Sequence, residues 1–442
     1  PVPGDPDAYV TPDGPRAYEH HEEIVHVKDR ESETVDVLWT VWGPVIDHDH
    51  WDRARALSWV AHHDEAVNAA LVEIERARTI DEALDIANRC GVPAQNAVVA
   101  GRDGRIGWTV MGVIPRRVGF DGKVPTSWAD GSRRWDGWLE PGENPRIVDP
   151  PGGRIWTANN RVVTGEMLDK IGNRHGLGAR ARQIRDRLLA AESFTEEEML
   201  DIQLDDRAVF LERWRDLLLE ILTPDVVAED PRRAELRRLV QDDWNGRASI
   251  DSVGFRLTRA FRSFLSQELR DSLLASCEEA DSRFLYRGQW EGPLWRIVTE
   301  RPMHLLDPSY DSWEDRLIEV IDRTIHYFTE SGAALEEKTW GQRNTILVQH
   351  PISQQAPVLS RWLDMPAVEL PGDRYMPRVQ GLGDGASERM VVSPGREERG
   401  IFHMPGGQSG HPFSPHYGDG HEDWVRGTPS PLLPGPAVHT LT

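Results

Sequence analysis

The sequence predicts an α+β fold, in which strands from both ends of the chain complete a sheet beside a helical middle. Three observations carry this prediction. Strand patterns recur between residues 23 and 158, helical apolar stripes fill residues 178–340, and short strands return in the tail. A chain of 442 residues can bury a sizeable core in one large domain or in two to three ordinary ones.

Strands open the chain and helices follow them. Residues 23–28 and 34–41 are rich in strand-forming side chains, and Gly43-Pro44 interrupts the pattern before Val45 and Ile46. From residue 51 to 87 the apolar spacing becomes helical, and the stretch 79–82 (TIDE) is typical of a helix start. We therefore expect two helices between residues 51 and 87.

A hairpin, a loop and one more strand come next. The Asp103-Gly104 turn between the β-rich runs 96–100 and 106–111 predicts an antiparallel hairpin. Residues 112–154 are dense in Pro, Gly and Trp without periodicity, which predicts a long ordered loop. A short buried strand is expected at 154–158, directly before Asn159 and Asn160.

The middle of the chain is helical and the tail returns to strands. Several helical stripes predict a packed core, and the clearest consists of Phe210, Trp214, Leu217, Leu218, Ile221 and Leu222. Short strands are expected at 345–348, 390–393 and 400–403. These patterns divide the chain into a sheet-rich part (1–177), a mainly helical region (178–339) and C-terminal strands and turns that complete the core (340–442).

Composition and charge narrow the class of protein. Apolar residues make up 39% and charged residues 28% of the chain, as is typical of globular proteins. The formal net charge of -22 argues against binding to nucleic acid or anionic lipid through a general basic surface. No apolar run reaches the roughly eighteen residues that a membrane span needs. The two cysteines, Cys90 and Cys277, exclude a disulfide scaffold and a cysteine-built zinc site.

Two stretches resemble catalytic motifs without matching them. Residues 21–26 (HEEIVH) have one residue too many for the HExxH metalloprotease motif, whose histidines share one helical face. Ser409 stands among glycines but does not match the nucleophile elbow of serine hydrolases. A Ser409 nucleophile with His411 or His416 as its base stays an open alternative.

Residues 155–161 (IWTANNR) form the most specific candidate site. Two adjacent amides, Asn159 and Asn160, and the cation Arg161 stand where a short buried strand is expected to end. A side-chain NH₂ group at a strand end is well placed to donate to an oxyanion. The alternative is that both amides tie down the following loop. The residue types alone leave these two interpretations equally open.

Several short motifs, in their order along the chain, resemble the β chain of penicillin acylases. They are 39–46 (WTVWGPVI), 93–96 (PAQN), 103–108 (DGRIGW), 112–117 (GVIPRR), 158–161 (ANNR), 339–344 (TWGQRN), 386–391 (ASERMV) and 406–412 (GGQSGHP). Together with their surroundings they run from about residue 25 to the C-terminus. Each motif alone is too short to indicate a family. The resemblance is specific because the motifs follow one another in the same order as in the family's β chain.

The resemblance implies an N-terminal-nucleophile hydrolase, with an αββα sandwich and a large helical insertion. In this family a precursor cuts itself into α and β chains. The new N-terminal serine of the β chain attacks a linear amide with its own α-amino group as base, and water then hydrolyses the acyl-enzyme. The implied substrate is a small N-acyl compound, such as a penicillin, an acyl-homoserine lactone or a related amide.

The resemblance also assigns roles to residues. By motif position, Asn159 is similar to the asparagine whose amide stabilises the tetrahedral oxyanion, and Arg180 to an arginine close to the nucleophile. Asp169 corresponds to a ligand of one structural calcium ion, and Glu166 competes for that assignment because the spacing from Asn159 differs by one residue. The family implies no organic cofactor.

The start of the chain departs from the family pattern. The family's β chain opens with a serine, usually followed by asparagine, whereas this sequence opens Pro1-Val2-Pro3. We therefore expect a fragment that begins inside the β chain, lacks the nucleophile and the partner α chain, and is inactive alone. The alternative is a non-catalytic binding protein on the same scaffold. Export to the periplasm or the cell exterior is common in the family, and the sequence carries no signal peptide that would show it.

Overall fold

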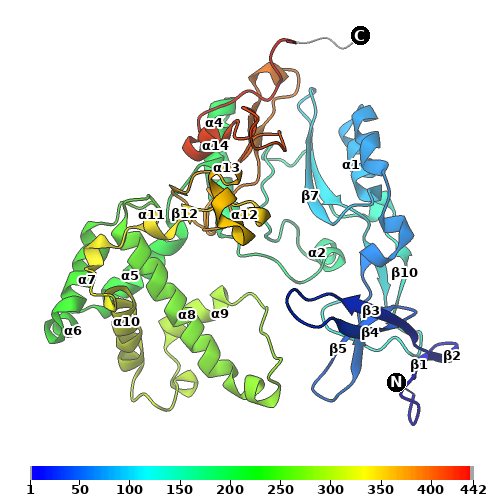
Figure 1. The fold of residues 1–442 in the computed structure, drawn as a ribbon, viewed down its shortest axis with the longest axis horizontal. Coiled ribbons are helices and arrows are strands. Elements are labelled where there is room, and N and C mark those ends of the chain that lie inside the picture. Colours follow the sequence, from blue (N-terminus) through cyan, green and yellow to red (C-terminus); the bar gives the residue numbers. More distant parts are fainter. Residues whose placement is uncertain (1, 439–442) are drawn as a thin grey trace. The chain divides into compact units, whose positions relative to one another are not determined.

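The computed structural model describes residues 2–438 and divides the chain into two compact units. Unit 1 comprises Pro1–Thr157, Arg161–His175 and Glu278–Leu285, and unit 2 comprises Ala158–Asn160, Gly176–Cys277 and Tyr286–Thr442. Unit 1 holds most of the longer strands and unit 2 most of the helices (Figure 1). The chain is therefore of the mixed α+β class that the sequence predicts, while the division into three segments stays a prediction.

The two longest strands of unit 1, β3 and β4, belong to a four-stranded antiparallel sheet with the order β3-β4-β5-β6 (Figure 1). Its strands are β3 (Glu19–Val25), β4 (Glu33–Thr40), β5 (Gly43–His48) and β6 (Ala54–Ala56). The two strands predicted around residues 23–41 are thus confirmed, although the first begins and ends earlier than expected. A separate hairpin of β1 (Ala8–Thr11) and β2 (Gly14–Ala17) precedes this sheet.

Only the second of the two helices expected between residues 51 and 87 is present. Residues 60–76 form three 3₁₀ segments, η1 (Val60–His62), η2 (Asp64–Ala66) and η3 (Ala70–Arg76), which together bury only Ala66. A helical pattern without a buried apolar face gains little from packing, so the longer helix does not form. The second prediction is confirmed as α1 (Ile80–Arg89), where the Thr79 hydroxyl accepts from the Glu82 N–H.

The predicted hairpin is confirmed as β7 (Gln95–Ala100) and β8 (Ile106–Met111), with Ala100 opposite Ile106. Gly104 takes φ +86° in its turn, a backbone conformation that favours glycine. The prediction that residues 112–154 lack strands is wrong. They contain β9 (Pro115–Val118), β10 (Arg134–Trp138) and β11 (Arg146–Val148). These strands are short and the β9–β10 ladder is irregular, so no alternation was visible in the sequence.

Unit 2 is built mainly from helices, as predicted for residues 178–340. The helices after α2 (Glu166–Ile171) are α3 (Ala179–Leu189), α4 (Glu196–Gln203), α5 (Val209–Ile221), α6 (Pro224–Glu229), α7 (Pro231–Asp242), α8 (Val253–Ala280), α9 (Glu291–Glu300), α10 (Trp313–Thr329) and α11 (Trp340–Arg343). Leu200 of α4 packs with Val391 and Ile401 of the tail, whereas the apolar faces of the helices from α5 onward share one large core. The predicted stripe on α5 lies in it, with Trp214 fully buried and Phe210 packed at its border.

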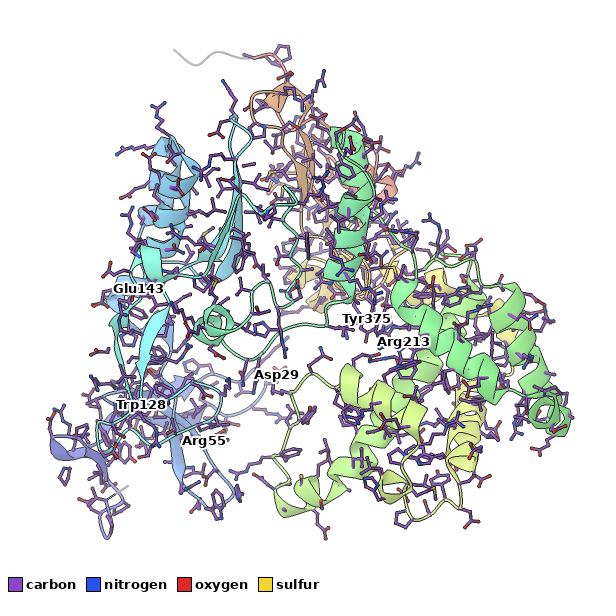
Figure 2. The ribbon with its side chains drawn as sticks, turned by 180° about the vertical axis from the view of Figure 1, so that it is seen from behind. Asp29, Arg55, Trp128, Glu143, Arg213 and Tyr375 are labelled. Carbon is purple, nitrogen blue, oxygen red and sulfur yellow. The ribbon has the colours of Figure 1, made fainter. Side chains whose placement is uncertain are left out.

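A buried carboxylate links three of these helices. Glu291, at the start of α9, accepts hydrogen bonds from Arg213 of α5, from Arg262 of α8 and from the Trp214 indole at 2.9 Å. Only 3% of the Glu291 side chain is exposed. Figure 2 shows Arg213 near Tyr375, whose ring centroid lies 4.5 Å from that of Phe210 with the two rings tilted by 36°. Buried charges of this kind are tolerated because the carboxylate faces two guanidinium groups, although Nε of Arg213 and Nε of Arg262 are buried without a hydrogen-bond partner.

The tail contains short ladders and a few short helices. Its elements are β12 (Thr345–Ile346), α12 (Pro351–Gln355), α13 (Ser360–Leu363), β13 (Val368–Glu369), β14 (Arg389–Val391), β15 (Ile401–His403) and α14 (His421–Arg426). The three predicted strands are confirmed in shortened form. In the part of the chain that the structure describes, β12 pairs only with β13 and β14 only with β15. These strands of two or three residues find local partners, and the expectation that tail strands complete the sheet of the N-terminal part stays a prediction.

Among residues 2–438, no helix combines the length and the apolar character that crossing a bilayer requires.

A buried histidine in the tail makes the stability of unit 2 depend on pH. The ring of His403 is 1% exposed, donates from Nε2 to the Thr428 carbonyl at 2.7 Å, and leaves Nδ1 without a partner. Burial lowers the pKa of His403 below its ordinary value of 6.5, and Arg389, directly opposite on β14, lowers this pKa further. The hydrogen bond to the Thr428 carbonyl and the Asp423 carboxylate act in the opposite direction, and burial outweighs them. The native state therefore favours the neutral ring.

We expect the free energy of unfolding to fall as the pH decreases below 6.5. Between the lowered native pKa and the ordinary value, the unfolded chain binds more protons than the folded chain, so acid favours unfolding. Urea denaturation from about pH 8 to about pH 5, compared with His403→Gln, measures this contribution. The variant should show a shallower loss of stability below pH 6.5. Identical slopes for both proteins would assign the acid sensitivity to other groups.

Candidate active site around Asn159

Residues 154–158 do not form the strand predicted from the sequence. The chain bends at Ala158–Asn160, and Asn159 has a left-handed backbone with φ 59°. The Ala158 N–H donates to Oδ1 of Asn160 at 2.8 Å instead of to a neighbouring strand. Asparagine tolerates the left-handed region and competes for backbone donors, which explains the turn. One of the two amides, Asn160, thus fixes the local backbone.

The other amide points to an arginine. A guanidinium N–H of Arg180 donates to Oδ1 of Asn159 at 2.7 Å. Arg180 reaches this position because α3 begins at Ala179, which places Arg180 in its first turn. Since a guanidinium only donates, its partner must be the amide oxygen, and this fixes which way the amide is turned. The NH₂ group of Asn159, whose side chain is exposed in this chain, is left to donate to another group.

The charge of Arg180 is not balanced by a carboxylate. Among residues 2–438, none of the ion pairs involves Arg180, although its side chain is half-buried. Burial lowers the pKa of Arg180 from its ordinary value, because desolvation disfavours the charged form. An arginine nevertheless stays protonated in proteins. A fixed amide donor and an uncompensated positive charge therefore lie side by side.

A glycine holds the backbone of Asn159. The Gly176 N–H donates to the Asn159 carbonyl at 2.6 Å. Asn159 is thus anchored twice within unit 2, by Gly176 at its backbone and by Arg180 at its side chain. These two contacts act on different ends of the residue, so together they fix both its position and its orientation.

The third residue predicted for the site, Asp169, lies on α2 in unit 1. Its carboxylate contacts the Lys123 ammonium at 3.3 Å, and Glu166 lies exposed on the same short helix. No group of three or more His, Cys, Asp or Glu that could hold a metal occurs in residues 2–438. A calcium ion takes six to eight oxygen ligands, so these residues alone do not fit one. Calcium binding at Asp169 stays a prediction.

The alternative serine is not paired with a base. Oγ of Ser409 accepts from the backbone N–H of His411 at 3.2 Å. Nδ1 of His411 accepts from the Phe413 N–H, and Nδ1 of His416 contacts Asp419 at 2.6 Å. Within the described part of the chain, neither imidazole bonds to the Ser409 hydroxyl. A serine nucleophile needs a base within hydrogen-bond reach, so this arrangement gives the Ser409 alternative no support.

Comparison with known proteins places the chain in a family. The model of the penicillin amidase family matches residues 2–437, which is nearly the whole sequence. The chain belongs to the penicillin amidase family. The family resemblance drawn from the motifs is thereby confirmed.

The names of two similar proteins state different acyl compounds, a penicillin and an acyl-homoserine lactone. The chain is 27% identical to the penicillin acylase 2 proenzyme of Pseudomonas sp. strain SE83, over 90% of this chain and 52% of the relative. It is also 27% identical to the acyl-homoserine lactone acylase QuiP of Pseudomonas aeruginosa, over 80% of this chain and 46% of the relative. The chain thus spans about half the length of the curated relatives it matches.

A solved structure confirms the fold. The chain resembles thermostable penicillin G acylase from Alcaligenes faecalis with a TM-score of 0.62 and 18% identity, over 100% of this chain and 84% of the solved one. This likeness shows the α+β fold of the N-terminal-nucleophile hydrolases, as expected for a penicillin amidase family member. Of the residues predicted by motif position, the structure brings Asn159 and Arg180 into contact. The motifs did not indicate Gly176, since nothing separates it from the other 37 of the 38 glycines.

Proposed function

We propose that this chain supplies the oxyanion-binding residues of an amidohydrolase that cleaves a linear amide bond. The single observation that carries the proposal is the amide of the exposed residue Asn159, whose oxygen accepts from Arg180, so that its NH₂ group is turned away from the guanidinium. Membership of the penicillin amidase family supports it.

In the proposed reaction, a serine hydroxyl attacks the amide carbonyl and gives a tetrahedral intermediate with a negatively charged oxygen. The Asn159 NH₂ group donates to that oxygen, while the nearby Arg180 cation makes the surroundings more favourable for negative charge. The amine then leaves, and water hydrolyses the acyl-enzyme. We propose that the serine is N-terminal, that its α-amino group is the base, and that both lie outside residues 1–442.

The proposed substrates are small N-acyl compounds. The names of the relatives support this class, because one relative is a penicillin acylase and another an acyl-homoserine lactone acylase. We further propose an α chain from the same precursor as partner, and export from the cytoplasm. The isolated chain is proposed to be inactive, because the proposed serine lies outside residues 1–442.

The proposal is tested with the complete gene product that contains this chain. The purified protein is incubated with phenylacetylated, long-chain-acylated and homoserine-lactone amides, and the released amine is quantified. Mass spectrometry of the quenched reaction then looks for an acyl group on an N-terminal serine. Amine release together with an acylated serine supports the amidohydrolase. If a stable protein binds these amides without releasing amine, the result supports the alternative, a non-catalytic binding protein on the same scaffold.

A further inference from the structure

The closest neighbour of Asn159 is the backbone of Gly176. Besides the 2.6 Å hydrogen bond between their backbones, the Cα of Gly176 approaches Asn159 closely. A methyl group at position 176 would lie 3.2 Å from Cβ of Asn159 and 3.2 Å from its carbonyl oxygen. These distances are shorter than ordinary van der Waals contacts, so Asn159 or residue 176 would have to shift by a few tenths of an ångström.

Position 176 requires glycine because a Cβ there would lie too close to Asn159, and not because its φ is positive. Gly165 and Gly172, earlier in the same stretch, have φ of 60° and 141° and open space where a Cβ would lie. Gly176 is absent from the residues with positive φ, so its φ does not by itself require glycine. The three atoms nearest to a Cβ at position 176 all belong to Asn159, so this contact restricts the side chain there.

We propose that Gly176 is a positioning residue for the Asn159 amide. The inference rests on the proposed function of Asn159. It adds Gly176 to the residues of that site, although Gly176 is uncharged and does not contact the reacting atoms. Gly176 fixes the carbonyl of Asn159, its missing side chain lets Cβ of Asn159 approach, and Arg180 then sets the amide plane. The left-handed backbone of Asn159 is held by these contacts.

A small displacement of this amide has a large consequence for the reaction. Oxyanion donors act over roughly 2.7–3.1 Å, and functional groups must stay within about 0.5 Å of their productive position. Because a methyl group at position 176 would press on both Cβ and the carbonyl of Asn159, we expect it to shift the residue as a whole. We expect Gly176→Ala to lower kcat about tenfold and to leave KM within about twofold, because the donor acts mainly in the transition state.

Gly178 offers a matched control two residues along the chain. It precedes the first residue of α3, it has an ordinary backbone with φ -73°, and no atom lies within 4 Å of an added Cβ. Gly178→Ala therefore makes the same chemical change in the same loop without touching Asn159. The complete protein carrying each variant is assayed for kcat and KM against one acyl amide, and the melting temperature of each is recorded.

A double variant separates positioning from general damage. If Gly176 acts through Asn159, adding Gly176→Ala to Asn159→Ala causes no further loss of kcat, because residues that act as a unit are not additive. A further tenfold loss in that background, or equal effects of Gly176→Ala and Gly178→Ala, would overturn the inference. If Asn159→Ala itself leaves kcat unchanged, the proposed function fails instead.

A crystal structure of the Gly176→Ala protein tests the same inference without an assay. The expected result is an Asn159 side chain moved away from Arg180, with the 2.7 Å contact lengthened or broken. An Asn159 side chain that keeps its place and its contact with Arg180 would contradict the proposal, whatever the activity of the variant.

Discussion

Replacing Asn159 by alanine in the complete protein is expected to lower kcat for amide hydrolysis by about 10²–10³. The variant loses the NH₂ group that Arg180 holds in place, so the developing negative charge on the carbonyl oxygen loses one oriented donor. KM should change little, because this donor contributes more to the transition state than to substrate binding. Steady-state kinetics with a chromogenic acyl amide measures both constants.

Asn173→Ala is the matched control for this prediction. Asn173 is also an exposed asparagine, and its NH₂ group donates to the Lys123 carbonyl at 3.3 Å, within unit 1. Its replacement should leave kcat within about twofold, since it removes a surface bond of modest net value. Equal losses of kcat in the two variants, or no loss in either, would remove Asn159 from the proposed reaction.

Replacing Glu291 by glutamine should lower the free energy of unfolding by about 3–5 kcal/mol. The change is nearly isosteric, yet it removes the negative charge that faces Arg213 and Arg262 across three helices. Two guanidinium groups would then lie against an amide that also presents donors of its own. Urea denaturation followed by circular dichroism measures the loss, because the affected helices dominate the signal.

Glu300→Gln on the same helix is the control for the buried carboxylate. Glu300 pairs with Arg296 one turn away at 2.8 Å, but its side chain is 57% exposed. Exposed pairs of this kind contribute about 0.2–1 kcal/mol, so this variant should unfold close to the wild-type midpoint. If Glu291→Gln is no more destabilising than Glu300→Gln, the buried cluster is held by packing and not by its charges.

The elements predicted correctly from the sequence are those whose position is determined by residues next to one another in the chain, such as a turn or a helix cap. The Asp103-Gly104 turn set the hairpin of β7 and β8, and Thr79 marked the start of α1. The prediction failed for residues 60–76, where the apolar spacing was helical but almost nothing is buried. It also failed at Asn159, because a left-handed residue after an apolar run looks like the end of a strand. Which side chains are buried, and which residues take a left-handed backbone conformation, depends on tertiary contacts that a sequence pattern does not show.

The candidate site was predictable only in part, and for a similar reason. Asn159 and Arg180 were found because they stand in recognisable motifs, and their contact at 2.7 Å is what the structure adds. Gly176 carries no functional group, and its importance lies in an interatomic distance to a residue seventeen positions earlier (176 minus 159). No composition or spacing rule indicates such a contact before the chain is folded.

The bond between Arg180 and Oδ1 of Asn159 also has a genetic consequence. Asparagine and aspartate codons differ by a single base, and an aspartate at this position would have the same size and keep a guanidinium partner. Such a mutant would fold, and its melting curve would look normal, yet its carboxylate could only accept hydrogen bonds. Sequencing this one codon in family members would therefore identify proteins that lack the proposed oxyanion donor but that expression and stability screens pass as intact.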